Sequence, residues 1–94
     1  MKFFLGMDVG TVSAKWALIG ARDRIEALKA RANSPVAEVY AYSDDPTKAI
    51  AVSSYSRIQG RPLEASAKLL AELFEHVSAD EIGGAIVTGA AAKL

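Results

Sequence analysis

The chain of 94 residues has no cysteine, only one histidine and no net formal charge. Because cysteine is absent, this chain can form no disulfide bridge, no thiolate metal site and no cysteine nucleophile. Its 11 basic side chains are balanced by 11 acidic ones, so no long-range attraction draws it to nucleic acid or to anionic lipid. We therefore expect neither nucleic acid nor a membrane among its partners.

Long apolar runs are also missing, although 51% of the residues are hydrophobic. No stretch approaches the ~18 uninterrupted apolar residues that a membrane span requires. The apolar start of the chain ends at the acidic Asp8 and is too short for a signal peptide. A charged fraction of 23% is ordinary for a folded domain, so we expect one cytoplasmic domain over residues 1–94.

Apolar periodicity predicts an α/β fold with a mixed sheet. The expected strands are 3–9, 14–19, 36–42, 50–58 and 85–87, and the expected helices are 21–33 and 63–77. The first two strands form an antiparallel hairpin, and the helix before the last strand acts as a right-handed crossover. If the last strand lies beside the first, Thr88-Gly89 and Gly10-Thr11 emerge at one sheet edge, where open α/β sheets bind ligands.

Local patterns refine these elements. The spacing of Asp23 and Glu26 predicts a capping box for the first helix, and that of Ser78 and Glu81 predicts another before the last strand. Residues 50–58 are expected to form one continuous strand. The second helix is expected to present one apolar stripe, made of Leu63, Ala67, Leu70, Phe74 and Val77.

The turn between the first two strands carries the residues most suited to phosphate chemistry. Gly10 allows close approach of a phosphate, and successive N–H groups up to Ser13 can converge on its oxygens. Thr11 and Ser13 add hydroxyl donors, and Lys15 adds a point charge. Asp8 is suited to hold Mg²⁺ through water, since this ion prefers oxygen ligands and retains part of its hydration shell.

These residues also have a purely structural interpretation. An Asp-x-Gly-Thr turn also closes ordinary hairpins, where its side chains satisfy local backbone donors. His76 lacks a second histidine or cysteine for a metal site, so we expect it to be solvated near a helix end. Trp16 is expected in the core, and Asp44-Asp45 in a solvated turn.

Three segments resemble known families. Phe4 to Lys15 is similar to the first phosphate loop of the actin, Hsp70 and sugar-kinase superfamily. Tyr55 to Ala65 and Ile86 to Gly89 resemble the BadF/BadG/BcrA/BcrD ATPase family, which includes the activators of 2-hydroxyacyl-CoA dehydratases. Residues 21–48 have no counterpart there and are expected to be an insertion. Ala90-Ala91-Ala92 departs from the aromatic or Gly-rich continuation typical of that family.

The resemblance implies the N-terminal part of an actin-like (ribonuclease H-like) ATPase lobe that binds ATP or ADP with Mg²⁺. Such proteins use hydrolysis to drive an electron from a [4Fe-4S] cluster into a dehydratase or reductase, and the cluster bridges the two subunits of a homodimer. The cluster cysteines and second phosphate loop would lie beyond Leu94, so this chain alone is expected to be inactive. By position, Asp8 corresponds to the Mg²⁺ residue, and the nucleotide-binding residues are Gly10, Thr11, Ser13, Lys15, Thr88 and Gly89.

Two other functions remain open at this point. The first phosphate loop alone does not separate an ATPase from a carbohydrate kinase of the same superfamily. The path from this loop to Thr88-Gly89 is short, however, and no sugar-binding cluster is apparent in it. The second alternative is a non-catalytic α/β interaction module, in which the turn after Asp8 is merely structural.

Overall fold

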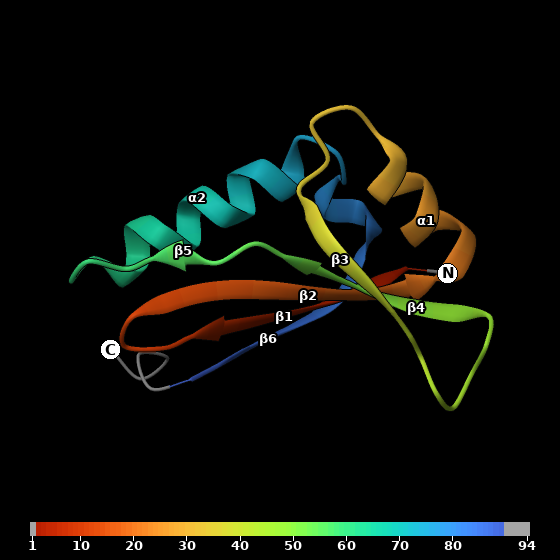
Figure 1. Cartoon of the computed structure of the whole chain (residues 1–94), viewed down its shortest axis with the longest axis horizontal. Coiled ribbons are helices and arrows are strands. Elements are labelled where there is room, and N and C mark those ends of the chain that lie inside the picture. Colours follow the sequence, from red (N-terminus) through yellow and green to blue (C-terminus); the bar gives the residue numbers. More distant parts are fainter. Residues whose placement is uncertain (1, 90–94) are drawn as a thin grey trace.

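Six strands form one mixed sheet in the computed structural model, which describes residues 2–89 (Figure 1). The strands are β1 (Phe3–Val9), β2 (Ser13–Ala21), β3 (Val36–Ala41), β4 (Lys48–Ser53), β5 (Ser56–Arg57) and β6 (Ile82–Thr88). The helices are α1 (Arg22–Ala30), α2 (Pro62–Phe74) and the short 3-10 helix η1 (Ala79–Glu81). No helix in this part of the chain is long and apolar enough to cross a membrane. The predicted α/β class with a mixed sheet is confirmed.

The strand order β3-β4-β2-β1-β6 places the last strand beside the first, while β5 pairs separately with β2. β1 and β2 are antiparallel, in a register that pairs Asp8 with Lys15. β6 runs parallel to β1 and pairs Thr88 with Asp8. The predicted hairpin is confirmed, and so is the parallel orientation of the last strand. The place of this strand beside β1 meets the condition under which Thr88-Gly89 and Gly10-Thr11 emerge at one sheet edge.

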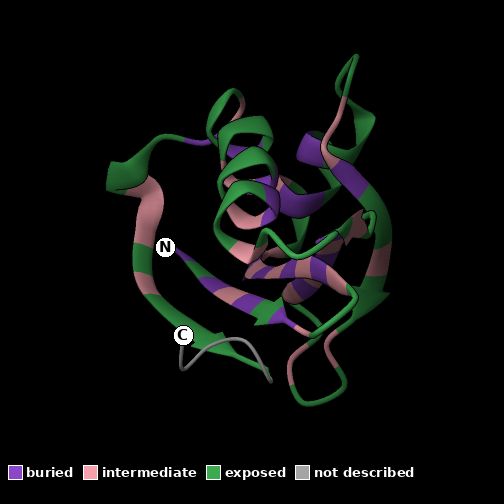
Figure 2. Cartoon of the chain, turned by 90° about the vertical axis from the view of Figure 1, so that its left-hand side faces the viewer, coloured by how far each residue is buried: buried purple, intermediate pink, exposed green. Residues whose placement is uncertain are grey.

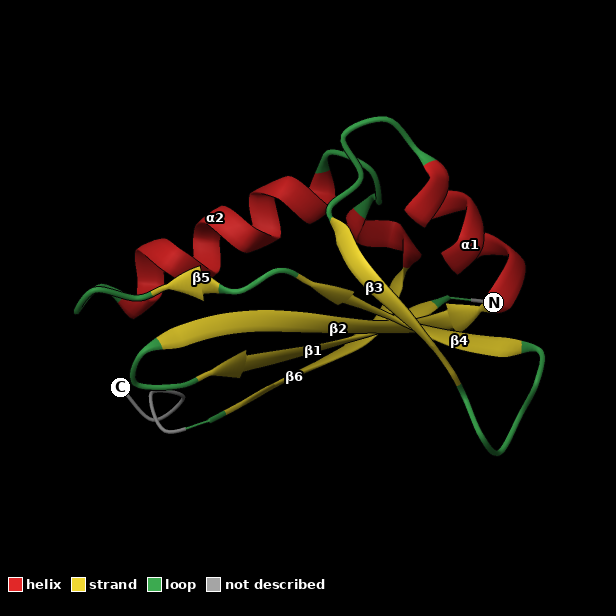
Figure 3. Cartoon of the chain, viewed as in Figure 1, coloured by secondary structure: helices red, strands yellow, loops and turns green. Residues whose placement is uncertain are grey.

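Both α-helices cover the same face of the sheet (Figures 1 and 3). α1 packs mainly on β3 and β4, and α2 packs mainly on β2. Burial alternates along β1 and β2 because successive strand residues point to opposite faces (Figure 2). Trp16 is 1% exposed and packs in the core, as predicted. On the opposite face, which we call the open face, Phe4 and Tyr40 remain about half exposed.

The predicted second helix is confirmed as α2, but the apolar stripe expected on it is only partly buried: Val77 is buried and Leu70 packs against the core, whereas Leu63 and Phe74 are exposed. The helix buries Ala65, Leu69 and Leu73 against the sheet, whereas Leu63 is 84% exposed. The predicted stripe and the buried one lie on neighbouring sides of the helix, and both contain apolar residues at helical spacing. Because α2 carries more apolar surface than one contact can cover, its periodicity alone could not show which side faces the sheet.

The predicted 50–58 strand is divided into β4 and β5. The hydroxyl of Ser53 accepts a hydrogen bond from the backbone N–H of Trp16 (2.9 Å) and donates one to the carbonyl of Ser54 (2.9 Å). In a continuous pair of strands, the N–H of Trp16 would donate to a backbone carbonyl instead of to this hydroxyl. Pairing with β2 resumes only where Ser56 lies opposite Ala14.

The capping box predicted at Asp23 and Glu26 is also wrong. α1 follows β2 directly, with Ala21 at the N-cap and no side-chain cap. The first helical N–H, that of Arg22, donates instead to the carbonyl of Thr47 (2.8 Å). The side chain of Glu26 accepts from the Arg22 guanidinium (2.9 Å), so it serves an ion pair on the helix surface.

The segment 21–48, predicted to be an insertion, is joined to the rest of the fold by α1 and β3. The Arg24 guanidinium pairs with the Glu81 carboxylate and lies 4.4 Å from the centre of the Phe3 ring. The Arg31 side chain donates to the carbonyl of His76 (3.0 Å). These contacts join the segment to both ends of the stretch that connects α2 to β6.

Acidification is expected to weaken one of these ties. Glu81 accepts a hydrogen bond from the backbone N–H of Ser78 (3.1 Å), completing the predicted capping box. This bond, and then the nearby Arg24, hold the pKa of Glu81 below its ordinary value of 4.5. A lowered folded-state pKa stabilises the fold above the unfolded-state value, and this stabilisation is lost as the pH falls through the folded-state pKa.

Replacing Glu81 by Gln should therefore lower the free energy of unfolding at pH 7, by less than about 1 kcal/mol because the ion pair is partly solvated. The difference from the unsubstituted chain should shrink toward pH 3 in urea unfolding curves. Glu72→Gln, on an exposed part of α2, is the matched control. A Glu81 deficit that is the same at both pH values would contradict this account.

Candidate functional site

The carboxyl ends of β1 and β6 lie together at one end of the sheet, next to the β1–β2 turn (Figure 1). Asp8 pairs with Lys15 on one side and with Thr88 on the other. Residues opposite one another on neighbouring strands point to the same face. The side chain of Asp8 is exposed. Three predicted site residues from three strands thus meet on the open face, at the edge that the sequence indicated.

Gly89 lies against the backbone and side chain at the end of β1. A Cβ atom added to it would lie 2.4 Å from the carbonyl oxygen of Val9 and 2.8 Å from Oδ1 of Asp8. Its φ of +107° lies in a region that residues with a side chain rarely adopt. Glycine is therefore required at this position, and its close approach helps to define where the Asp8 carboxylate sits.

The β1–β2 turn offers fewer donors than the sequence predicted. The N–H of Gly10 donates to the carbonyl of Ser13 (3.0 Å), because this pair closes the hairpin. The predicted convergence of N–H groups is therefore wrong at Gly10. Within residues 2–89, no backbone carbonyl accepts from the N–H groups of Thr11 or Val12. Both residues are exposed, so their N–H groups and the Thr11 hydroxyl are what this turn can present to an anion.

A second loop, which sequence reasoning did not assign to the site, reaches the same end of the sheet. The N–H of Ile58 donates to the carbonyl of Val12 (2.9 Å), which fastens this loop to the β1–β2 turn. Gln59 and Gly60 both have positive φ, 50° and 75°. The N–H of Arg61 then donates to the carbonyl of Ile58 (2.8 Å), giving the pattern of a type I′ turn. The turn brings the start of α2 to the predicted site.

Lys15 has an aromatic neighbour that its sequence context did not indicate. Its Nζ lies 5.1 Å from the centre of the Tyr55 ring, within the range of a cation–π interaction. Tyr55 follows β4, 40 positions along the chain, and is 69% exposed. The contact depends on the break in pairing between β4 and β5, so the regular strand predicted over 50–58 does not indicate it.

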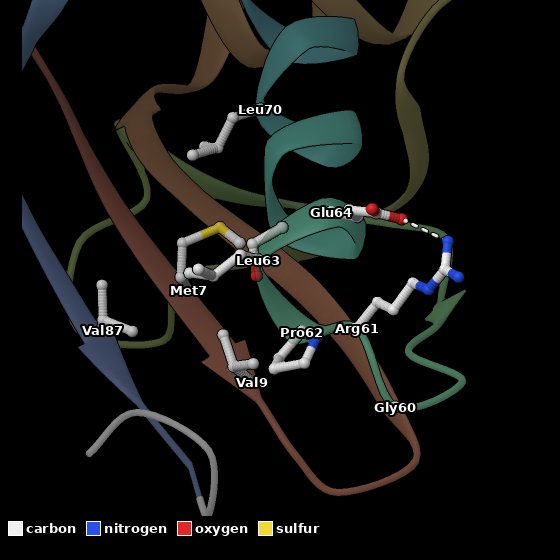
Figure 4. A pocket seen from close by; sticks show the side chains of 10 residues that line it. Met7, Val9, Gly60, Arg61, Pro62, Leu63, Glu64, Leu70 and Val87 are labelled. Atoms are coloured by element: carbon white, nitrogen blue, oxygen red, sulfur yellow. Dashed lines mark hydrogen bonds and ion pairs between the residues drawn. The ribbon is translucent and has the colours of Figure 1, made fainter. Parts of the chain in front are cut away.

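An apolar groove lies on the helix side of the same end of the sheet. It has a volume of about 610 Å³, and Figure 4 shows Met7 and Val9 of β1 facing Leu63 and Leu70 of α2 across it. Val87 of β6 lines it as well and is 56% exposed. Part of the apolar stripe expected on α2, namely Leu63 and Leu70, therefore lines an open groove.

The remaining sequence candidates have structural contacts. A ring nitrogen of His76, Nε2, lies 3.1 Å from the carbonyl of Asn33, beyond the end of α2. The carboxylate of Asp45 accepts from the hydroxyl and the N–H of Thr47, and these bonds hold its pKa below the ordinary value. Asp44 is exposed beside it in the β3–β4 turn. Both residues lie in a turn, as expected.

Asp8 is a single carboxylate at its edge. The described residues contain no group of three or more His, Asp or Glu side chains that could hold a metal ion directly. A Mg²⁺ ion bound there would keep most of its water shell, as this ion commonly does beside phosphate groups.

The predicted departure at Ala90–Ala92 lies outside the described residues. No protein-family model, curated protein or solved structure matches this chain, so the case for a function rests on these side chains and their placement.

Proposed function

We propose that this chain binds the phosphates of ATP or ADP with Mg²⁺, as the first half of the nucleotide-binding lobe of an actin-like ATPase. The observation that carries the proposal is the meeting of Asp8, Lys15 and Thr88 on adjacent strands at the carboxyl ends of β1 and β6. Ligands of open α/β sheets bind outside the carboxyl ends of the strands. The antiparallel hairpin and the helix between β4 and β6 also agree with the lobe that the resemblance implies.

Each residue has a distinct part in the proposed binding. Asp8 accepts hydrogen bonds from waters of a Mg²⁺ ion, and Lys15 supplies a positive charge to the phosphate oxygens. The hydroxyl groups of Thr11, Ser13 and Thr88 are further donors. Gly89 keeps the approach to Asp8 open, since any side chain there would occupy the same space.

The proposed parent activity is that of the dehydratase activators. In it, ATP hydrolysis drives an electron from a [4Fe-4S] cluster, held outside this chain, into a dehydratase or reductase. Phosphoryl transfer depends on charge stabilisation around the transferred group. One carboxylate and one ammonium group at one side of the phosphates supply only part of this stabilisation. We therefore propose binding without efficient turnover for the 94-residue chain.

Lys15→Met and Asp8→Asn separate the two parts of the site. In an NMR titration with ATP and Mg²⁺ at millimolar concentrations, Lys15→Met should weaken binding about tenfold or more, because it removes a charge-assisted contact. Asp8→Asn should chiefly remove the enhancement of ATP binding by Mg²⁺. Both side chains lie on the open face rather than in the core, so both variants should remain folded.

Lys48→Met and Asp44→Asn are the matched controls, because these residues lie at the other end of the sheet, by the β3–β4 turn (Figure 1). Neither control should change the titration. Shifts in the unsubstituted chain should be confined to residues near the β1–β2 turn and the end of β6. If ATP with Mg²⁺ produces no such shifts, the proposed function fails and a structural role of the turn takes its place.

A further inference from the structure

The ammonium group of Lys15 is held by a ring rather than by a carboxylate. It lies 5.1 Å from the centre of the Tyr55 ring. The four ion pairs found among residues 2–89 do not include Lys15, although Asp8 is its cross-strand neighbour. A cation on an aromatic face keeps its full charge, because a ring neutralises nothing.

A second carboxylate near Lys15 is already engaged. Lys15, Glu38, Tyr40 and Tyr55 line one cavity of about 260 Å³ on the open face. The carboxylate of Glu38 accepts a hydrogen bond from the hydroxyl of Tyr40, and this bond is the main cause that raises the pKa of Tyr40. Glu38 is thus directed to Tyr40, and the ion pairs found among residues 2–89 do not join it to Lys15.

We propose that Tyr55 is the positioning residue of Lys15, holding its ammonium group apart from the neighbouring carboxylates so that the charge is available to a phosphate oxygen. This inference rests on the proposed function. Lysine side chains lose much rotamer freedom when they bind. A ring that already restricts Lys15 in the free protein reduces this loss, and thereby strengthens binding without touching the nucleotide.

The contact itself can be measured without any ligand. Protons on the Cε of a lysine above an aromatic ring are shifted upfield by the ring current, and ¹H–¹³C NMR of the full chain would report this for Lys15. The shift should be present in the unsubstituted chain and in Tyr55→Phe, and absent in Tyr55→Leu. Tyr55 is 69% exposed, so the substitutions should leave the fold intact.

The effect on nucleotide is measured with ATP and Mg²⁺ on the same variants. Tyr55→Leu should weaken binding roughly threefold, the size of an exposed cation–π interaction, and Tyr55→Phe should restore it. In a Lys15→Met background, Tyr55→Leu should have no further effect, since a residue acting through Lys15 cannot act when Lys15 is absent. Tyr42→Leu is the matched control, because its ring lies 5.9 Å from Lys48 in a similar pair.

The outcomes distinguish this inference from the proposed function. Absence of the upfield shift in the unsubstituted chain would overturn the positioning role, whatever the chain binds. Additive effects of Tyr55→Leu and Lys15→Met would overturn it too, since Tyr55 would then contact the nucleotide independently. A normal upfield shift with no response to ATP would instead overturn the proposed function and, with it, the role toward phosphate, while the contact between ring and ammonium would stand.

Discussion

Leu73→Ala is expected to lower the free energy of unfolding by about 2–5 kcal/mol, the usual range for a buried leucine replaced by alanine. Leu73 is 0% exposed and belongs to the side of α2 that packs on the sheet. Its loss leaves a cavity that the surrounding strands cannot easily fill. Urea unfolding followed by the fluorescence of Trp16, which lies in the same core, would measure the change.

Leu63→Ala is the control for this prediction, because it makes the same substitution in the same helix. Leu63 is 84% exposed, so its loss should change the free energy of unfolding by no more than about 0.5 kcal/mol. The sequence pattern, in contrast, gave Leu63 no different place from the other apolar residues of this helix. Equal losses for the two variants would show that α2 packs differently from the arrangement described above.

Gly89→Ala is expected to affect both stability and the proposed site. The added Cβ would lie 2.4 Å from the carbonyl oxygen of Val9 and 2.8 Å from Oδ1 of Asp8, so the backbone or the carboxylate must move. With a φ of +107°, the strain should cost about 1–3 kcal/mol. The enhancement of ATP binding by Mg²⁺ should be lost together with the position of Asp8, as seen by titration of the folded variant.

Gly60→Ala separates backbone strain from the effect on Asp8. Gly60 also has a positive φ, +75°, but an added Cβ would meet no atom within 4 Å. This variant should lose about 1–2 kcal/mol from left-handed strain and keep its response to Mg²⁺. If both glycine variants lose that response, the contact between Gly89 and Asp8 does not define the site.

The hairpin and the crossover were predictable from the sequence, and the meeting of Asp8 with Thr88 at one sheet edge followed once the last strand was placed beside the first. Each depends on short-range patterns and on the few connections that a strand-helix-strand unit allows. Apolar residues in β1, followed by Gly10, suffice to predict a buried strand and its turn. The capping box at Ser78 and Glu81 was predictable for the same reason, since its residues are three apart.

The errors arise where several local solutions compete. α2 has apolar residues on more than one side, and only the sheet beneath it selects Leu73 over Leu63. The first N–H of α1 could have bonded to a side-chain cap, but it donates instead to the carbonyl of Thr47. The donors of the β1–β2 turn were overestimated because closing a hairpin requires the N–H of Gly10.

The sequence by itself determined the class of the fold and the end of the sheet at which its polar residues gather, because these depend on periodicity and on the order of the elements. Only the tertiary structure decided that Tyr55 meets Lys15 and that Gly89 packs on Asp8. Both contacts join residues far apart in the chain. They depend on strand register and on the break at Ser53, which is set by one buried hydrogen bond that no local pattern records.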